Sequence, residues 1–297
     1  MTSPDDQALE WLVCLNDTEA DDRLREEFAR WHAVPEHARA WRQAEAFWNR
    51  LNPVTAEIRR RRRLSRRAAI AGGSALVLAP LALLLTRPGR FADYRTFAGE
   101  TRELLLPDGS RVELAAGSAL SLDYATKERR LALHLGEAFF QVAADPEQPF
   151  IVKAGQAEFI ALGTAFNIRL FEDQVSLTVT EHRVLARRGQ VESVVEEGHR
   201  LVIGGSLATH AQAVDTDTET AWRQGTLVFE AAPLGEVMDV LGRNAGWRVM
   251  ISDRARRIPV TAMFKLSRLS DAPETIARTL PVRLSRLPGG VLVIRAE

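Results

Sequence analysis

The stretch AAIAGGSALVLAPLALLLT at residues 68–86 holds nineteen consecutive residues without a charged side chain. At a rise of about 1.5 Å per residue, a helix of this length covers roughly 28 Å, close to the ~30 Å hydrocarbon core of a bilayer. The alternative is a buried core helix. Such helices rarely run this long without a polar side chain, and Gly72, Gly73 and Pro80 are better tolerated in membrane helices. The stretch therefore predicts a single transmembrane helix.

Arginines crowd the residues immediately before this stretch, whereas only Arg87 and Arg90 follow it closely. The seven that precede it are Arg59, Arg60, Arg61, Arg62, Arg63, Arg66 and Arg67. Because positive flanks stay in the cytoplasm, we expect the basic juxtamembrane segment 58–67 to be topogenic, residues 1–67 to be cytoplasmic and residues 87–297 to be exported. A nucleic-acid patch or a solvated tail would also use arginines, but their place against the apolar stretch favours the topogenic role.

The entry to the span also resembles the twin-arginine export signature. Ser65-Arg66-Arg67 is followed by Ala69 where that signature usually has phenylalanine. Twin-arginine export and ordinary insertion both stay open. A cleaved signal peptide is not expected, because more than sixty residues lie upstream and no A-x-A site ends the apolar run.

Residues 1–57 contain three runs of apolar residues at helical spacing. The runs are Ala8, Trp11, Leu12 and Leu15; Leu24, Phe28 and Trp31; and Trp41, Ala44, Trp48 and Leu51. They predict a small cytoplasmic domain of three helices. Helices this short cannot fully cover four tryptophans that each bury on the order of 200 Å². Trp11, Trp31, Trp41 and Trp48 are therefore the candidate partner-binding residues, the alternative being that all four form the core of the bundle.

Charge narrows the kind of partner. Residues 1–57 hold twelve acidic side chains and six arginines, a balance of 6 − 12 = −6, although the whole chain has a net charge of +0. A negative domain repels phosphate, so no direct contact with nucleic acid is expected and a basic protein fits better. The one cysteine, Cys14, excludes an intrachain disulfide, and the six histidines lack ligand spacing. We expect no metal and no cofactor.

After the span the pattern changes to a period of two. Runs such as Arg111-Val112-Glu113-Leu114 alternate polar and apolar residues, which predicts a mainly antiparallel β domain over residues 94–205. Residues 206–222, rich in Thr, Ala and Asp, are predicted to be a linker. The remainder, 226–297, predicts a βαβ unit followed by a βαββ unit, a small α+β module. Its expected elements are strands at 226–230, 248–252 and 260–264, helices at 233–245 and 271–280, and a hairpin through Pro288-Gly289-Gly290.

Four blocks in the β region resemble the periplasmic core of FecR-type sigma-factor regulators. They are Leu106-Pro107-Asp108-Gly109-Ser110 with Val112 and Leu114; Leu133, Gly136-Glu137-Ala138, Phe140 and Val142; Pro149-Phe150 and Val152; and Leu162-Gly163-Thr164 with Phe166. Trp11, Leu15, Phe28, Trp31, Pro35, Glu36, His37 and Ala40 resemble the sigma-binding domain of that family. Phe229, Pro233-Leu234, Val237, Leu241 and the 258–264 segment resemble its secretin and TonB short N-terminal-like module. Glu181-His182 departs from the family, which commonly places a glycine there in a turn, so we expect this hairpin to be built differently.

The resemblance implies a bacterial inner-membrane anti-sigma factor with its N-terminus in the cytoplasm and its C-terminus in the periplasm. It implies three kinds of partner: an extracytoplasmic-function sigma factor at the tryptophan-bearing domain, the periplasmic signalling domain of a TonB-dependent outer-membrane receptor within 226–297, and membrane proteases. An iron or siderophore signal is the expected input. Such a relay is not an enzyme. The chain accordingly has no GxSxG elbow, no P-loop and no GxGxxG.

The pair Gly163-Thr164 is the one position where covalent chemistry is expected. Some members of the family that the chain resembles cut themselves at a matching Gly-Thr pair. Glycine leaves its own carbonyl unshielded and tolerates a strained backbone. The hydroxyl of the following threonine can attack that carbonyl and turn the amide into a hydrolysable ester. The alternative is a glycine required by a bulge or turn, followed by a threonine with strand propensity.

Two other functions stay open at this point. A membrane-tethered DNA-binding regulator would need a basic helix in residues 1–57, and an anchored periplasmic enzyme would need a convergent polar site in residues 94–297. The sequence shows neither feature. The sequence also leaves open the inducing ligand, the cognate partners and whether the cytoplasmic domain inhibits or activates.

Overall fold

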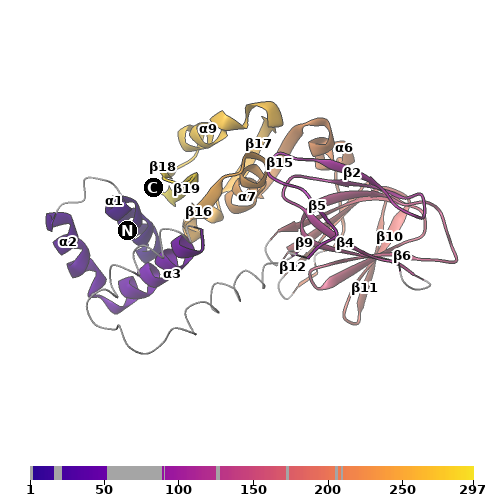
Figure 1. Ribbon diagram of the computed structural model, residues 1–297, viewed down its shortest axis with the longest axis horizontal. Helices are drawn as coiled ribbons and strands as arrows, with labels where there is room; N and C mark the ends of the chain where they lie inside the picture. The colour runs from indigo at the N-terminus through magenta and orange to yellow at the C-terminus, as the bar shows by residue number, and fades with distance from the viewer. Residues whose placement is uncertain are drawn as a thin grey trace.

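The structure is a computed structural model that describes residues 3–16, 22–51, 89, 91–124, 128–171, 174–204, 207–208 and 210–297. A helical unit, a large β domain and a C-terminal α+β module follow one another along the chain (Figure 1). Within these residues no helix is both long and apolar enough to cross a membrane. The predicted span at 68–86 and the arginines of 58–67 lie outside the described residues, so the membrane anchor stays a prediction.

The helical unit has the three helices that the apolar spacing predicts. They are α1 (Pro4–Asn16), α2 (Asp22–His32) and α3 (Pro35–Leu51). Ser3 caps the first helix, because its hydroxyl accepts a hydrogen bond from the Asp6 amide at 3.2 Å and donates one to the Asp6 carboxylate at 2.7 Å. Pro35 begins α3, where a missing amide hydrogen costs nothing.

The β domain is confirmed as mainly antiparallel. Its strands are β1 (Tyr94–Arg95), β2 (Arg102–Leu105), β3 (Arg111–Leu114), β4 (Ala119–Asp123), β5 (Arg129–Gln141), β6 (Phe150–Ala154), β7 (Ala157–Ala161), β8 (Ala165–Phe171), β9 (Gln174–Glu181), β10 (Arg183–Arg188), β11 (Val191–Glu196), β12 (His199–Gly204), β13 (Leu207–Ala208) and β14 (Gln212–Ala213). The long strand β5 joins two halves of the sheet. Its first half pairs with β4 and, in parallel, with β6, whereas its second half pairs with β3 and β8.

Gly136 marks the point where β5 changes partners. Its φ is +87°, and a Cβ there would lie 2.3 Å from the hydroxyl of Ser118. That hydroxyl donates a hydrogen bond to the carbonyl of Glu137 and accepts one from its amide. Only glycine allows the two backbones to approach this closely. The close approach lets β5 pass from one half of the sheet to the other.

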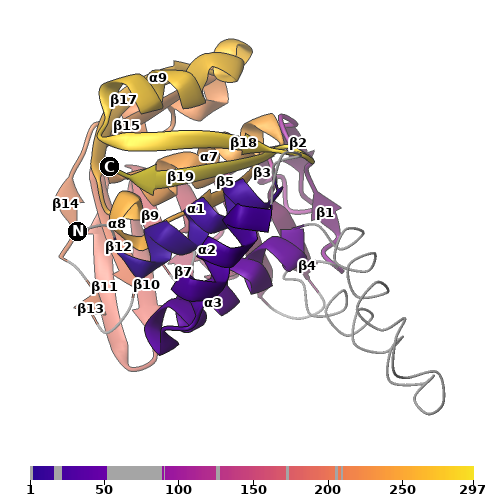
Figure 2. The ribbon, with the colours of Figure 1, turned by 90° about the vertical axis from the view of Figure 1, so that its left-hand side faces the viewer.

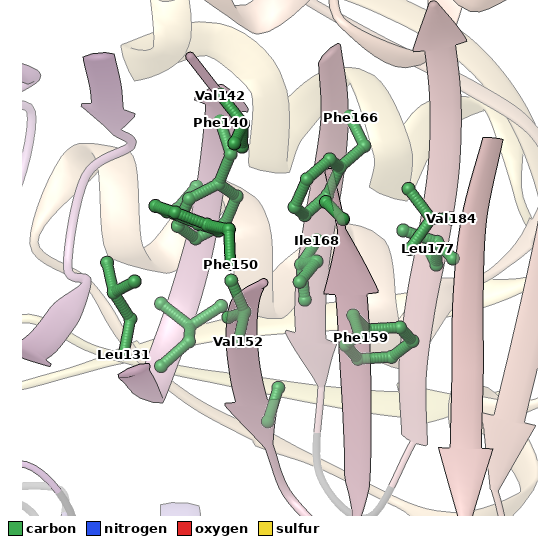
Figure 3. Packing of buried hydrophobic residues seen from close by; sticks show 14 of the residues in the cluster. Leu131, Phe140, Val142, Phe150, Val152, Phe159, Phe166, Ile168, Leu177 and Val184 are labelled. Carbon is green, nitrogen blue, oxygen red and sulfur yellow. The ribbon is translucent and has the colours of Figure 1, made fainter. Parts of the chain in front are cut away.

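The two halves pack face to face around one apolar core (Figure 3). Phe140 and Phe166, from the second half, are stacked with ring centroids 5.1 Å apart, and Phe150, from the first half, meets Phe140 edge-on at 6.1 Å. Phe159 of β7 is also fully buried in this core. Aromatic rings at these separations add to the stabilisation from area burial alone.

The C-terminal module has the predicted order of elements. They are β15 (Thr226–Pro233), α7 (Leu234–Ala245), β16 (Arg248–Ile251), α8 (Asp253–Arg256), β17 (Pro259–Lys265), the 3₁₀ turn η2 (Leu266–Asp271), α9 (Ala272–Thr279), β18 (Val282–Leu287) and β19 (Val291–Ala296). The strands form two sheets: β15 pairs with β17, and β19 lies between β16 and β18. The short helix α8 was not predicted from the sequence. It is capped by the Ser252 hydroxyl, which accepts from the Ala255 amide.

The stretch 206–222, predicted as a linker, contributes secondary structure to both neighbours. The strand β14 pairs with β12, and α6 (Thr216–Glu219) is capped by the Asp215 carboxylate. A 3₁₀ turn, η1 (Ala221–Gln224), then buries Trp222. Residues around Trp222 therefore pack as part of the fold because the indole ring belongs to the core shared with the C-terminal module.

The N-terminal helices contact the far end of the same chain. Leu9 and Leu12 of α1 and Trp48 of α3 share a buried apolar cluster with Val291 and Val293 of β19. Both ribbon views place α1 beside the three-stranded sheet of the C-terminal module (Figures 1 and 2). The helical unit thus covers one face of that sheet.

Candidate self-cleavage site and domain contacts

The candidate self-cleavage pair lies in the short connection from β7 to β8. Gly163 has a φ of +143°, a conformation that side chains strongly disfavour. A Cβ on Gly163 would also lie 2.8 Å from the Cα and 2.9 Å from the Cβ of Ala144. Glycine is required here by the backbone angle and by the close approach of the 142–145 segment.

Hydrogen bonds hold the backbone on both sides of Gly163. The carbonyl of Leu162 accepts from the Asp145 amide at 3.0 Å, and the carbonyl of Thr164 accepts from the Val142 amide at 2.9 Å. The neighbouring segment therefore fixes the two residues that flank the unusual φ. The bonds therefore keep Gly163 in a conformation that glycine adopts readily and that a residue with a side chain would adopt only under strain.

The hydroxyl of Thr164 is buried and has no hydrogen-bond partner among the described residues. Its residue is only 6% exposed. A buried polar atom without a partner costs about 1–3 kcal/mol, so it requires an explanation. A hydroxyl that is not held by a neighbour can turn toward the Gly163 carbonyl, which is the geometry that attack on that carbonyl requires.

A charged cluster forms hydrogen bonds to the backbone of the 142–145 segment. Arg129, which is 3% exposed, forms an ion pair of 2.8 Å with Asp108 and donates to the carbonyl of Ala143 at 3.0 Å. Asp108 accepts a 2.6 Å hydrogen bond from the Ser110 hydroxyl, which in turn accepts from the Ala143 amide. Burial opposes ionisation of Asp108, but the hydrogen bonds from Ser110 and Arg129 outweigh it and lower the pKa of Asp108.

The β domain and the C-terminal module share a core. Phe139 of β5 and Ala165 of β8 point away from the sandwich and pack with Trp222, Val237 and Leu241. The guanidinium of Arg223 lies 3.7 Å from the centroid of the Phe139 ring and pairs with Glu113. The two domains are thus held together by an apolar contact rather than by a flexible tether.

A buried ionic network crosses the same boundary. Arg169 of β8 lies 3.1 Å from Glu236 of α7 and 3.1 Å from Glu137 of β5, and Glu137 is 4% exposed at its side chain. Asn167 donates to Glu137 at 2.8 Å and accepts from the indole nitrogen of Trp222 at 3.3 Å. Burial alone would lower the pKa of Arg169, but Glu137 and Glu236 outweigh burial and raise it.

A cavity of about 220 Å³ opens beside this network, between the two domains. Its walls include Arg169 and Arg200 on the β domain and the successive residues 228–233 of β15 on the module. Ala231 there has a φ of +47° at an irregularity in the pairing of β15 with β17. The wall formed by the module belongs to residues 226–297, where the receptor contact is expected.

The four predicted tryptophans divide into two groups. Trp11, Trp31 and Trp41 surround Phe28 with ring centroids 4.7 to 6.0 Å from it, and all three are half-buried. Trp48 is 4% exposed in the cluster shared with β19, and Trp31 and Trp41 pack against that cluster. The structure therefore groups three of the candidates around Phe28 and buries the fourth in the adjoining cluster. Their role in binding a sigma factor stays a prediction.

The hairpin at Glu181-His182, expected to differ from the family, keeps a turn without glycine. His182 has a φ of +62°, the left-handed conformation that glycine adopts most easily. Its amide donates to the Glu197 carboxylate at 3.1 Å, and its carbonyl accepts from the Glu197 amide at 2.7 Å. The turn thus places a non-glycine residue in the left-handed region, at a cost in strain.

Sequence reasoning missed the contact between domains. The signal that could have found it is the loss of alternation in Gly136-Glu137-Ala138-Phe139-Phe140 and Ala165-Phe166-Asn167-Ile168. Strands that read as apolar or buried on both faces are covered on both sides. In the structure one face of these strands meets the sandwich core and the other meets the C-terminal module.

Comparisons with known proteins agree with this architecture. Residues 92–185 match the FecR protein family, and residues 6–47 match a domain of unknown function, DUF4880. Two crystal structures of a proposed anti-sigma factor from Parabacteroides distasonis ATCC 8503 share the fold, each with a TM-score of 0.62 and 22% identity over 69% of this chain and 98% of that one. No curated protein matches the sequence. The chain thus contains a FecR domain at residues 92–185, preceded by a helical domain that matches DUF4880 at residues 6–47.

Proposed function

We propose that the protein is a single-span inner-membrane anti-sigma factor that relays a periplasmic signal to a cytoplasmic sigma factor. One observation carries the proposal. The two matched domains, at 6–47 and 92–185, lie on opposite sides of seven arginines and a nineteen-residue uncharged stretch. That order is the one expected of a cytoplasmic domain, a membrane anchor and an exported domain.

The cytoplasmic partner in this proposal is an extracytoplasmic-function sigma factor. The acidic balance of residues 1–57 and the half-buried group of Trp11, Trp31 and Trp41 suit a basic protein surface with apolar contacts. The similar fold of a protein described as an anti-sigma factor supports this direction. Nothing in the proposal requires direct contact with DNA.

The periplasmic partner is the signalling domain of a TonB-dependent outer-membrane receptor. The ligand of that receptor in this proposal is a siderophore or a similar iron carrier. The C-terminal module offers the contact, and its strand β15 lines the cavity that faces the β domain. An extended strand from the receptor could add to such an edge through backbone hydrogen bonds. The shared core and the network around Arg169 would pass a displacement of the module to the β domain.

Release of the sigma factor would then follow proteolysis. Self-cleavage at Gly163-Thr164 would leave fragments 1–163 and 164–297 joined without a covalent bond. The cut would lie between β7 and β8. β7 of the first fragment pairs with β10 of the second, and β8 of the second fragment pairs with β5 of the first, so strand pairing would hold the two fragments together. Membrane proteases are the proposed enzymes that continue the cleavage once the receptor separates the fragments.

The test for topology uses reporter fusions to the full chain. Alkaline phosphatase joined after residue 297 should be active, and the same enzyme joined before residue 1 should be inactive. Replacement of the seven arginines of 58–67 by glutamine should reduce the first activity. Equal activity at both ends contradicts the membrane proposal.

The test for the partners uses the cognate extracytoplasmic-function sigma factor of this proposal. It should copurify with the full chain, and alanine at Trp11, Trp31 or Trp41 should weaken its capture while circular dichroism of the variant stays unchanged. Loss of folding in every variant, without a selective loss of capture, would assign these residues to the core. A chain lacking residues 226–297 should lose its response to the inducer, and a normal response would contradict receptor contact there.

A further inference from the structure

The contact between the N-terminal helices and the C-terminal sheet is specific in its polar groups. Asp6, which is 1% exposed, uses one carboxylate oxygen for the Ser3 hydroxyl and the other to accept the amide of Ala296 at 3.3 Å. On β19 the last residue that pairs with β16 is Ile294, so the Ala296 amide lies past the end of that pairing. The helix cap and the end of the strand are thus joined through one side chain.

A second polar contact lies one helical turn further along α1. Glu10 pairs with Arg295 at 3.5 Å between carboxylate and guanidinium. The Arg295 side chain is 12% exposed, and its Nε atom is buried without a hydrogen-bond partner among the described residues. The helix covers this arginine and supplies only part of its hydrogen bonding, which suggests a contact that can open.

The two surfaces also match in shape and charge. Ala40 and Ala44 of α3 line one groove with Met250 of β16, and Ala44, Trp48 and Met250 belong to the same apolar cluster. Residues 248–297, which carry all three strands of the sheet, hold ten basic and four acidic side chains, a balance of 10 − 4 = +6, against −6 for residues 1–57. The C-terminal sheet therefore has the basic charge and the apolar contact area expected of a partner for the acidic helical unit.

We infer that the C-terminal sheet is an interaction surface for the α1 and α3 face of its own chain, and that it closes this face until residues 87–297 are exported. The inference rests on the proposed function, because a membrane between residues 57 and 87 separates the two surfaces. A newly made chain has both surfaces in one compartment, so they cover each other. Export removes the sheet and leaves the α1 and α3 face, which carries Trp48, free to add to the sigma-factor contact proposed for Trp11, Trp31 and Trp41.

The contact can be detected by cross-linking two exposed positions across the groove. Gln43→Cys on α3 and Asp253→Cys on α8 line the same groove, and Cys14→Ser removes the native thiol. In a chain lacking residues 68–86, a short bis-maleimide should join the pair. Gln43→Cys with Glu192→Cys, which lies on the edge strand β11, is the matched control and should stay unlinked.

The same pair in the unaltered span, examined in intact cells, separates the two ideas. Exported chains should not cross-link, because the thiols lie on opposite sides of the membrane. Cross-linking of exported chains contradicts the proposed topology. Absence of a cross-link in the chain lacking 68–86 overturns the inference and leaves the topology standing.

Closure of the helical face has its own measurement. In the chain lacking 68–86, a thiol at Ala44→Cys should react with a maleimide about tenfold more slowly than in the same chain carrying Arg295→Glu, a factor equal to about 1.4 kcal/mol. Adding Glu10→Arg to Arg295→Glu restores opposite charges and should slow the reaction again. Equal rates in all three chains would show that the face is not closed by this contact.

Discussion

Arg169 of β8 lies 3.1 Å from Glu236 of α7, so one ion pair joins the β domain to the C-terminal module. The same arginine neutralises Glu137, which is almost fully buried. Arg169→Met should therefore leave Glu137 as an unpaired buried charge and reduce the free energy of unfolding by about 3–5 kcal/mol. Urea unfolding of the chain lacking 68–86, followed by circular dichroism, measures this loss.

Two variants show whether the loss comes from the buried charge. Glu236→Gln removes the more exposed partner and should cost only about 1 kcal/mol. Glu137→Gln combined with Arg169→Met removes both buried charges, so it should be more stable than Arg169→Met alone. If the double variant is no more stable than the single one, the loss comes from packing.

His182 offers a gain in stability. A non-glycine residue in the left-handed region costs roughly 1–2 kcal/mol, which glycine avoids. Part of this gain is lost, because glycine also gives the unfolded chain more conformational freedom. His182→Gly should therefore raise the free energy of unfolding by about 0.5–1 kcal/mol. His182→Ala keeps the strained backbone and should change stability little. A loss of stability in His182→Gly would mean that the imidazole has a contact that matters more than the backbone strain.

The Asp108 and Arg129 pair predicts loss of stability in acid. The pKa of Asp108 is lowered in the folded protein, so folding favours the ionised carboxylate. Its contribution is fully present above the ordinary aspartate value near 3.9 and is lost as the pH falls through the lower folded value. Asp108→Asn should cost about 1–3 kcal/mol at pH 7, and its deficit relative to the unaltered chain should shrink below about pH 4. A deficit that stays constant down to pH 2 would show that the charge is not responsible.

Local patterns were sufficient to predict most of the elements. The helices α1, α2 and α3 cover the three apolar runs of residues 1–57, and the order of strands and helices after residue 226 follows from alternating periods. These features depend on neighbours within a few residues, which a single sequence contains. The resemblance to FecR-type regulators likewise rests on short blocks, and the matched region at 92–185 contains all four of those in the β region.

Contacts between distant segments could not be predicted in the same way. The Arg169 network joins residues from 137 to 236, and Asp6 reaches Ala296 across nearly the whole chain. No periodicity specifies which element covers the outer face of β5, or that a linker rich in Thr and Ala buries Trp222. The Gly163-Thr164 pair was predicted from the family resemblance and from its chemistry, whereas the buried hydroxyl and the close approach of Ala144 became apparent only in three dimensions.

The last prediction concerns cleavage between Gly163 and Thr164. The hydroxyl of Thr164 attacks the carbonyl carbon of Gly163, the C–N bond breaks as the nitrogen takes up a proton, and the resulting ester is hydrolysed by water. The products are a carboxylate on Gly163 and a free amine on Thr164. Two observations favour this step, the φ of +143° at Gly163 and the unpartnered hydroxyl beside it.

The full chain, purified with protease inhibitors, should give two bands on a denaturing gel, with Thr164 as the new N-terminus. Thr164→Ala should give one band, because it removes the nucleophile. It also removes a buried hydroxyl without a hydrogen-bond partner, so this variant should be at least as stable as the uncut chain. Thr164→Ser keeps a nucleophile of the same kind and should still cut, whereas Thr164→Val keeps the shape without the hydroxyl and should not. Gly163→Ala is a poor test, because its Cβ would collide with Ala144 and disturb folding. A single full-length band from the unaltered chain after prolonged incubation would leave Gly163 with a structural role only, as the glycine that the 142–145 segment requires.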